Sequence, residues 1–473
     1  MRNICVFVNL TSWASCPSLC LKEPAVMIGR MFVIGLVWLG ATVLPARALE
    51  VQRVVSPGGI EAWLVEDHSN PIISMDFAFP GGASADPAGK EGLAHMVSGL
   101  LDEGAGDLDS QAFQRRLAEL SIRLSFDAGL DTFQGIMRTL KENQDTAFDL
   151  LRLALTAPRF DEEPVGRIRS QIRVQLERES ESPRRIAGRA LRQAMFPNHP
   201  YARPTHGTLE SLPAITVEDL RRFVADRLAL DVLKIAVVGD ITAKELAVRL
   251  DETFGALPGH AAPFEVADVV PRTNGEVVVI ERDLPQSVVI FGHAGIKRDD
   301  PDFYAAYVVN HILGGGSFNS RLFEEVREKR GLAYSVYSYL HPLDHAGLVM
   351  GGVATQNART GESLEVIRLE WKRMSESGPT REELEDAKTY LTGSYPLRFS
   401  STANIAGTLL VIQLDDLGID YVNERNKLIE AVTLEDARRV ANELFQADEL
   451  NFVIVGRPLG VLSDGTTTGD GDE

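Results

Sequence analysis

The chain has 473 residues, of which 44% are hydrophobic and 24% are charged. This composition is typical of globular proteins, and the length exceeds what one hydrophobic core usually serves, so we expect two domains. The formal net charge of −19 argues against nucleic acid and against an anionic membrane surface as partners, because both would repel an acidic protein.

The first 48 residues are typical of an export signal with a mis-annotated extra N-terminus ahead of it. Arg30 precedes an apolar run of about 14 residues, which is too short to span a bilayer, and the small-x-small triplet 46–48 follows. We expect translation to start at Met27 or Met31 and cleavage to follow Ala48. A bacterial-type signal predicts a periplasmic protein with no membrane span after cleavage. All three cysteines lie upstream of the cut, so the mature chain would have neither disulfides nor thiolate metal ligands.

The remainder of the chain contains an internal duplication. The segment AITVEDLRRFV at 214–224 matches AVTLEDARRVA at 431–441, and VVG at 237–239 matches IVG at 454–456 with the same offset of 217 residues. Each copy predicts a helix with a threonine N-cap, followed by a β-strand. Because solenoid repeats have periods nearer ~20 to 50 residues, the pattern indicates duplication of a whole domain.

Strand-like segments and long amphipathic helical segments occur within each half, which predicts an α+β fold in duplicate. We assign the first domain to residues 49–257 and the second to residues 276–461. The stretch 258–275 between them is rich in Pro and Gly and is predicted to be a linker. Residues 462–473 are predicted to form a disordered acidic tail.

The segment GLAHMVSGLLDEG at 92–104 predicts a helix with His95 on its polar face. A zinc-binding helix needs two histidines four residues apart and a nearby carboxylate that activates water. Here Gly99 occupies the position of the second histidine, and Ser98 stands where the carboxylate would be. Judged by the residues alone, a single helical histidine is more often a structural or surface residue than a metal ligand.

Three longer blocks, together with the duplicated halves, carry a resemblance to a known family. The blocks are GGASADPAGKEGLAHMVSGLLDEG, ESPRRIAGRALRQAMFPNHPYARPTHGT and GGGSFNSRLFEEVREKRGLAYSVYS. In this order they resemble the M16 family of metallopeptidases, the pitrilysin and mitochondrial-processing-peptidase group, over nearly the whole expected mature chain. The resemblance implies two homologous domains, each a mainly antiparallel sheet packed with helices, that form half of a clam-shell around a cavity.

Active members of this family carry His-x-x-Glu-His on the helix and a glutamate about 80 residues later as the third zinc ligand. By this resemblance His95 holds the first ligand position, while Ser98 replaces the general base and Gly99 replaces the second histidine. Gln175 stands at the third ligand position, with Glu177 two residues away. The resemblance therefore implies that this chain holds no catalytic zinc and no other cofactor, and that zinc belongs to a partner subunit.

In the family, an arginine and a tyrosine seven residues apart reach across the closed cavity, bind the substrate backbone and stabilise the oxyanion. Arg327 and Tyr334 match this pair, and Gly331 between them predicts the end of a helix and a chain reversal. A competing interpretation is that Arg327 only contacts the C-terminal end of its helix and Tyr334 only fills one face of a sheet.

Gly314, Gly315 and Gly316 are predicted to open the helix that leads to this pair. No Lys-Ser/Thr follows them, which disfavours a phosphate-binding loop. A glycine-rich loop contributes to substrate handling in the zinc-less subunit of the processing peptidases, although there it lies in the first half. By that resemblance we assign the three glycines to substrate binding.

These features predict the non-zinc subunit of a heterodimeric peptidase. Its partner would be a zinc-bearing M16 paralogue, and the substrate a peptide or a small unfolded protein. The alternative is a purely structural or peptide-binding M16-like subunit with no catalytic part, as with the core proteins of respiratory complexes that share this fold. A peptidase that acts alone would need metal ligands that the sequence does not offer.

Overall fold

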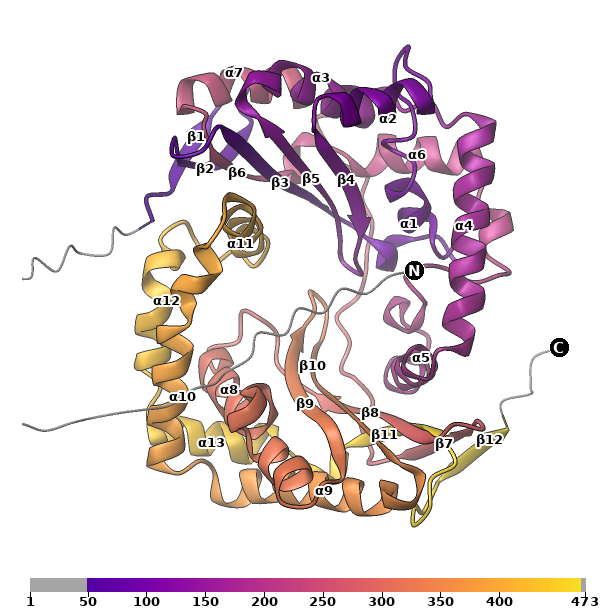
Figure 1. The fold of residues 1–473 in the computed structure, drawn as a ribbon, viewed down its shortest axis with the longest axis vertical. Coiled ribbons are helices and arrows are strands. Elements are labelled where there is room, and N and C mark those ends of the chain that lie inside the picture. Colours follow the sequence, from indigo (N-terminus) through magenta and orange to yellow (C-terminus); the bar gives the residue numbers. More distant parts are fainter. Residues whose placement is uncertain (1–48, 469–473) are drawn as a thin grey trace, which may run out of the picture. The chain divides into compact units, whose positions relative to one another are not determined.

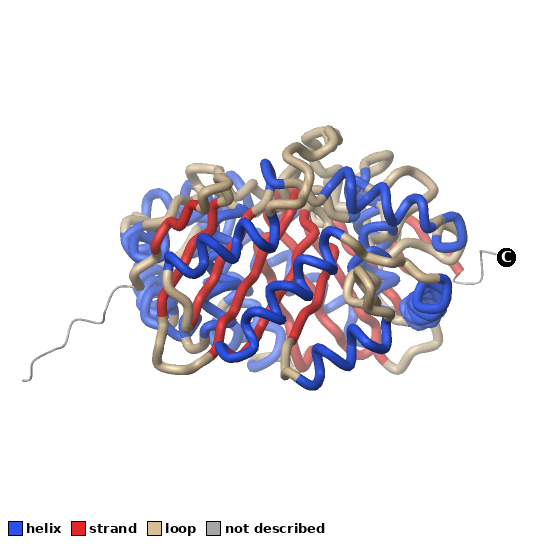
Figure 2. The backbone as a smooth tube through the Cα atoms, turned by 90° about the horizontal axis from the view of Figure 1, so that it is seen from above, coloured by secondary structure: helices blue, strands red, loops and turns tan. Residues whose placement is uncertain are grey.

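The computed structural model describes residues 49–468, so the predicted signal and the last five residues lie outside its described part. Two mixed sheets of six strands each, both packed with helices, make up this part (Figure 1). The α+β prediction is therefore confirmed. Figure 2 shows helices lying across the strands. None of the helices within residues 49–468 combines the length and the apolar character needed to cross a membrane.

The first sheet has the strand order β1-β2-β6-β3-β5-β4, and all its neighbours are antiparallel except β2 and β6. Its strands are β1 (Gln52–Val55), β2 (Glu61–Glu66), β3 (Ile72–Pro80), β4 (Arg123–Ala128), β5 (Thr132–Leu140) and β6 (Lys234–Gly239). The helices of this half are α1 (Leu93–Ser98), α2 (Ser110–Glu119), α3 (Gln144–Thr156), α4 (Glu162–Glu181), α5 (Pro183–Met195), α6 (Val217–Arg227) and α7 (Ala243–Phe254).

The second sheet has the order β12-β7-β11-β8-β10-β9, with β7 parallel to both of its neighbours and the other pairs antiparallel. Its strands are β7 (Val277–Glu281), β8 (Gln286–Ala294), β9 (Ala333–Pro342), β10 (Gly347–Gln356), β11 (Asn451–Gly456) and β12 (Gly465–Thr468). The helices are α8 (Phe303–Asn310), α9 (Thr360–Ser377), α10 (Arg381–Gly393), α11 (Thr402–Leu414), α12 (Tyr421–Glu430) and α13 (Leu434–Leu444), with shorter turns η6 (His311–Gly315), η8 (Phe323–Glu328) and η10 (Tyr395–Phe399).

The duplication is visible in the helices and strands that the repeated segments form. Thr216 and Thr433 each begin a helix with a reciprocal capping box, in which the threonine accepts from the third backbone N–H and an aspartate bonds back. The helices α6 and α13 then lead to β6 and β11, and each of these strands occupies the third place in its sheet. The predicted duplication of a whole domain is confirmed.

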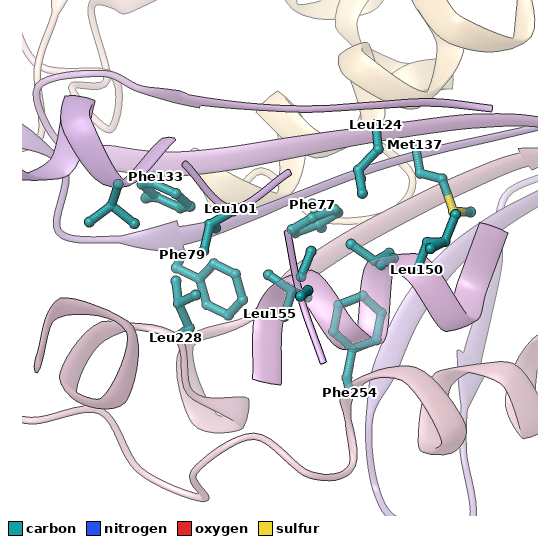
Figure 3. Packing of buried hydrophobic residues seen from close by; sticks show 14 of the residues in the cluster. Phe77, Phe79, Leu101, Leu124, Phe133, Met137, Leu150, Leu155, Leu228 and Phe254 are labelled. Carbon is teal, nitrogen blue, oxygen red and sulfur yellow. The ribbon is translucent and has the colours of Figure 1, made fainter. Parts of the chain in front are cut away.

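Aromatic side chains form the centre of the first core. The ring of Phe77 packs edge-on against Phe79, Phe126 and Phe254, with ring centroids 5.7 to 6.2 Å apart. Figure 3 shows Phe77 with Phe79 and Phe254. These side chains come from the first sheet and from α7, and they are joined by buried leucines of α1 and α3. Burial of this apolar surface holds α1 against the sheet, which fixes the position of His95.

Each half contributes one helix that packs on the sheet of the other half. Helix α5 belongs to the first half by sequence, but its buried residues Leu191 and Met195 pack on β8 and β11 of the second sheet. Helix α11 belongs to the second half, and its residues Ile405 and Leu409 pack on the first sheet. In Figure 1, α5 lies beside the second sheet and α11 beside the first. Neither half buries all of its own apolar surface, so the two halves stabilise each other.

The connection between α7 and β7 contains no helix or strand and is bonded to both halves. The carbonyl of Ala267 lies 2.9 Å from Nε2 of His199, and the N–H of Val269 donates to the carbonyl of His345. Near this connection the hydroxyl of Tyr201 donates to Asp131 and accepts from the N–H of His345. These bonds give the NHPYARP segment a structural role.

The predicted disordered tail is partly wrong. Residues 465–468 form β12, which pairs in parallel with β7 and extends the second sheet. Asp464, directly before this strand, is bonded to β7. Its carboxylate accepts the N–H of Val277, and its own N–H donates to the carbonyl of Val277. Three consecutive threonines favour the extended backbone. The disorder prediction was based on the acidic and glycine-rich composition of the segment and did not take this preference into account.

Candidate functional site

The degenerate zinc helix α1 is short. Leu93, Met96 and Val97 bury its apolar side, and the helix ends at Ser98, earlier than the apolar pattern indicated. The carboxylate of Asp86 accepts the N–H groups of Gly92 and Ala94 at the start of the helix. Burial raises the pKa of this carboxyl to about 7, although the backbone N–H bonds oppose the change.

The imidazole of His95 is largely enclosed. It stacks on His206 with ring centroids 4.3 Å apart, and its Nδ1 is buried without a hydrogen-bond partner among residues 49–468. Burial lowers the pKa of His95 to about 4, and the nearby His206 acts in the same direction. The side chain is therefore neutral at physiological pH.

Gln175, on α4, belongs to the same cluster. Its Nε2 lies 3.1 Å from Oε1 of Glu179 and 3.0 Å from Nδ1 of His206. The Glu179 oxygen in turn lies 2.9 Å from Nδ1 of His206. Glu177 is exposed and stands outside the cluster. The sequence analysis missed His206 and Glu179, because no spacing rule connects His206 with a helix more than a hundred residues before it.

These residues do not fit a zinc ion. The hydroxyl of Ser98 donates to the carbonyl of His95 at 2.8 Å, so it turns back onto its own helix. A side chain at Gly99 would meet Cγ2 of Ile168 at 3.3 Å, which shows that α4 packs close to the position of the missing histidine. Within residues 49–468, no group of three His, Cys, Asp or Glu side chains could hold a metal ion. One imidazole beside a glutamine amide falls short of a catalytic zinc site.

The fold places Arg327 and Tyr334 side by side. Arg327 lies near the end of η8, where Gly331 adopts a left-handed conformation with φ of 60°. The N–H of Gly331 bonds to the carbonyl of Arg327, and the next N–H, that of Leu332, bonds to the carbonyl of Val326, so the left-handed glycine ends this helical segment. The chain reverses there, and the Arg327 guanidinium carbon lies 4.8 Å from the centroid of the Tyr334 ring.

The hydroxyl of Tyr334 and the guanidinium of Arg327 remain available for hydrogen bonds. The side chain of Tyr334 is 83% exposed, and its hydroxyl bonds to no other residue of the described chain. Arg327 also lies over the ring of Phe323, and its one ion pair within residues 49–468 is a 3.7 Å contact with exposed Glu328. Tyr334 therefore does not fill a sheet face, as the competing interpretation required. Cation–π contacts orient the guanidinium without using its hydrogen-bond donors.

The three glycines have a different place from the expected one. Gly314 and Gly315 end the helical segment formed by α8 and η6, and Gly316 follows directly, so they close one helix rather than open the next. A Cβ at Gly314 would lie 2.8 Å from the backbone nitrogen of Ser338 on β9. Close packing of this helix end on the strand accounts for the glycine, and substrate binding by the three glycines stays a prediction.

Two protein-family models match consecutive parts of the chain. The family model described as Insulinase (Peptidase family M16) matches residues 62–209. The model described as Peptidase M16 inactive domain matches residues 214–391. The two matches follow one another and include strands of both sheets.

Several relatives match along most of the chain. The non-peptidase homolog YmxG of Helicobacter pylori is 29% identical over 413 residues, which cover 87% of this chain and 95% of that protein. The uncharacterized zinc protease YmxG of Bacillus subtilis is 26% identical over 412 residues, with 84% and 96% covered. A crystal structure of a peptidase M16 inactive domain from Pseudomonas fluorescens has a TM-score of 0.81 at 28% identity and covers 88% of this chain and 99% of its own. The chain therefore belongs to peptidase family M16, and its degenerate ligand positions are consistent with the zinc-less type of that family.

Proposed function

We propose that this chain is the zinc-less subunit of a heterodimeric M16 peptidase and that Arg327 and Tyr334 act in the catalytic site of the complex. The partner is a zinc-bearing M16 paralogue, which supplies the His-x-x-Glu-His helix and the activated water. The substrate is a peptide or a small unfolded protein. Export by the N-terminal signal would bring the reaction to the periplasm of a bacterium.

The proposal rests chiefly on the arrangement of Arg327 and Tyr334. Three aromatic rings, those of Phe318, Phe323 and Tyr334, lie within 5.9 Å of the Arg327 guanidinium carbon and hold it in place. The Tyr334 hydroxyl bonds to no other residue within 49–468 and lies at the surface. A purely internal role would bury these groups or pair them, so this geometry favours a ligand that comes from outside the chain.

The chemistry of the two groups suits the hydrolysis of a peptide bond. Arginine stays charged over the whole relevant pH range and can donate hydrogen bonds to the backbone carbonyls of a substrate. A tyrosine hydroxyl in a site closed to water donates a strong hydrogen bond to the oxyanion. Removing one such donor typically lowers kcat on the order of 10²–10³-fold.

The test uses the exported chain purified alone and together with a zinc-bearing M16 paralogue from the same genome. We expect the pair to cleave an unstructured peptide and the single chain to be inactive. Arg327→Ala and Tyr334→Phe should each lower the kcat of the pair on the order of 10²-fold, with zinc content and complex formation unchanged. Arg330→Ala and Tyr390→Phe are matched controls, because both side chains are at the surface outside the proposed site.

The same measurements distinguish the proposed function from the alternative one. Full activity of the Arg327 and Tyr334 variants would favour a structural or peptide-binding subunit without a catalytic part. The name of the Helicobacter pylori relative, a non-peptidase homolog, is compatible with either function, because a zinc-less subunit has no activity of its own. Peptide cleavage by the single chain would contradict both.

A further inference from the structure

A cavity of about 550 Å³ lies in the second half of the chain, between α8, η10, α11 and α12. Figure 1 shows α8, α11 and α12 around this region, with α11 also covering the first sheet. Five aromatic side chains line the cavity: Phe303, Tyr304, Tyr307, Tyr395 and Tyr421. Its volume is in the range of small-molecule sites. Neither Arg327, Tyr334 nor His95 lines it, so it is separate from the residues of the proposed function.

The cavity is cationic although the whole chain is acidic. Three arginines line it, Arg298, Arg398 and Arg425, against one carboxylate, that of Asp415. Nε of Arg298 lies 3.4 Å from Oδ2 of Asp415, so this acid offsets one of the three positive charges. In the described part of the chain neither Arg398 nor Arg425 forms an ion pair. Two guanidinium groups thus remain without an anion.

Arg425 is the more unusual of these two. Arg425 is 7% exposed, and its guanidinium carbon lies 4.4 Å from the centroid of the Tyr395 ring. Its Nη1 donates to the carbonyl of Leu391 at 2.9 Å and to the side chain of Asn426 at 3.1 Å. These neutral acceptors orient the guanidinium but leave its charge uncompensated. A desolvated cation without a counter-charge is costly, and a bound anion would relieve that cost.

The rest of the wall suits an apolar body. Small and apolar residues of α11 line the cavity, among them Ala403, Gly407 and Val411. Val411 is 55% exposed, whereas most of the other apolar residues of α11 are buried against the first sheet. The rings of Phe303 and Tyr307 are nearly parallel, with an interplanar angle of 9°. Flat apolar walls of this kind favour an aromatic ligand.

We propose that this cavity binds a carboxylate carried on an aromatic or apolar body, with the carboxylate at the unpaired guanidinium groups and the body against the tyrosines. A free aromatic acid has this chemistry, and so has the C-terminal residue of a peptide. The inference does not depend on the proposed function, because a non-catalytic subunit would bind the same ligand.

Calorimetric titration of the purified protein tests the proposal with N-acetylphenylalanine. We expect saturable binding with a Kd below about 1 mM. N-acetylphenylalaninamide, which lacks the charge, should bind at least about tenfold more weakly. A hexapeptide that ends in phenylalanine, compared with its amidated form, distinguishes the two sources. Tighter binding of the free-acid peptide than of N-acetylphenylalanine indicates a peptide C-terminus, and equal or weaker binding indicates a small acid.

Two kinds of variant locate the site. Val411→Trp, which fills the cavity from an exposed position, should lower the affinity for N-acetylphenylalanine by at least about 100-fold. Val248→Trp on α7 is the matched control, since that side chain is 51% exposed and lies outside the cavity. Arg398→Ala, at the exposed rim, should weaken binding about threefold. Thr408→Phe is a second filling variant if circular dichroism shows that Val411→Trp is misfolded. The proposal is overturned if acid and amide bind equally, if neither binds, or if a folded filling variant binds as well as the original chain.

Discussion

The replacement His95→Gln should make the protein less sensitive to mild acid. His95 is enclosed by His206 and the surrounding core, and burial lowers its pKa from 6.5 to about 4. The folded chain therefore binds fewer protons at this site than the unfolded chain does between these two values. Stability that depends on the neutral imidazole is fully present above about pH 6.5 and is lost as the pH falls toward about 4. Glutamine does not titrate, so the variant lacks this loss.

The size of the effect follows from the two pKa values. A tenfold change in proton affinity is worth about 1.4 kcal/mol, so the full window corresponds to about 3 kcal/mol. At pH 5 the loss should have reached about 2 kcal/mol relative to neutral pH. Asp86 and Asp102, whose pKa values burial raises to about 7 and about 6, change stability in the opposite direction. Their contributions cancel when the variant and the original chain are compared at each pH.

Urea unfolding followed by circular dichroism at pH 7.5 and pH 5 measures this difference. The free energy of unfolding should fall by about 2 kcal/mol more in the original chain than in His95→Gln. His260→Gln, at a side chain that is 90% exposed, controls for the loss of an imidazole as such. Equal acid sensitivity of the original chain and His95→Gln would refute the assignment of a neutral, enclosed His95.

Four further predictions concern the stability of the fold. Gly314→Ala should cost about 1–3 kcal/mol of stability, because its Cβ would press on β9. Gly188→Ala on α5, where a Cβ meets nothing within 4 Å, should instead add up to about 1 kcal/mol, and thermal unfolding measures both. Thr433→Ala removes the capping box of α13 and should cost about 1 kcal/mol in urea unfolding. Trp371→Phe removes the buried bond from Nε1 to His293 and should cost about 2–4 kcal/mol, and an unchanged unfolding midpoint would contradict that bond.

The sequence predicted those features that depend on neighbouring residues or on a repeated pattern. The threonine caps of α6 and α13 and the stop at Gly331 follow from short-range rules of capping and chain reversal. The strands β6 and β11 follow from short apolar runs rich in β-branched residues. The duplication is equally evident from the amino-acid sequence, because two copies of one segment occur at a fixed offset. The missing histidine and carboxylate of the zinc helix belong to the same group, because a ligand must be present as a side chain for any fold to position it.

Only the tertiary structure decided which distant residues meet. His206 reaches His95, and Arg425 reaches the cavity beneath α11, through packing between elements that no local periodicity connects. The exchange of α5 and α11 between the sheets has the same origin, since an apolar helix face does not specify which sheet it covers. Burial then set the chemistry, because it lowers the pKa of His95 and makes the uncompensated charge of Arg425 costly. The exclusion of water behind both effects is a property of the folded chain alone.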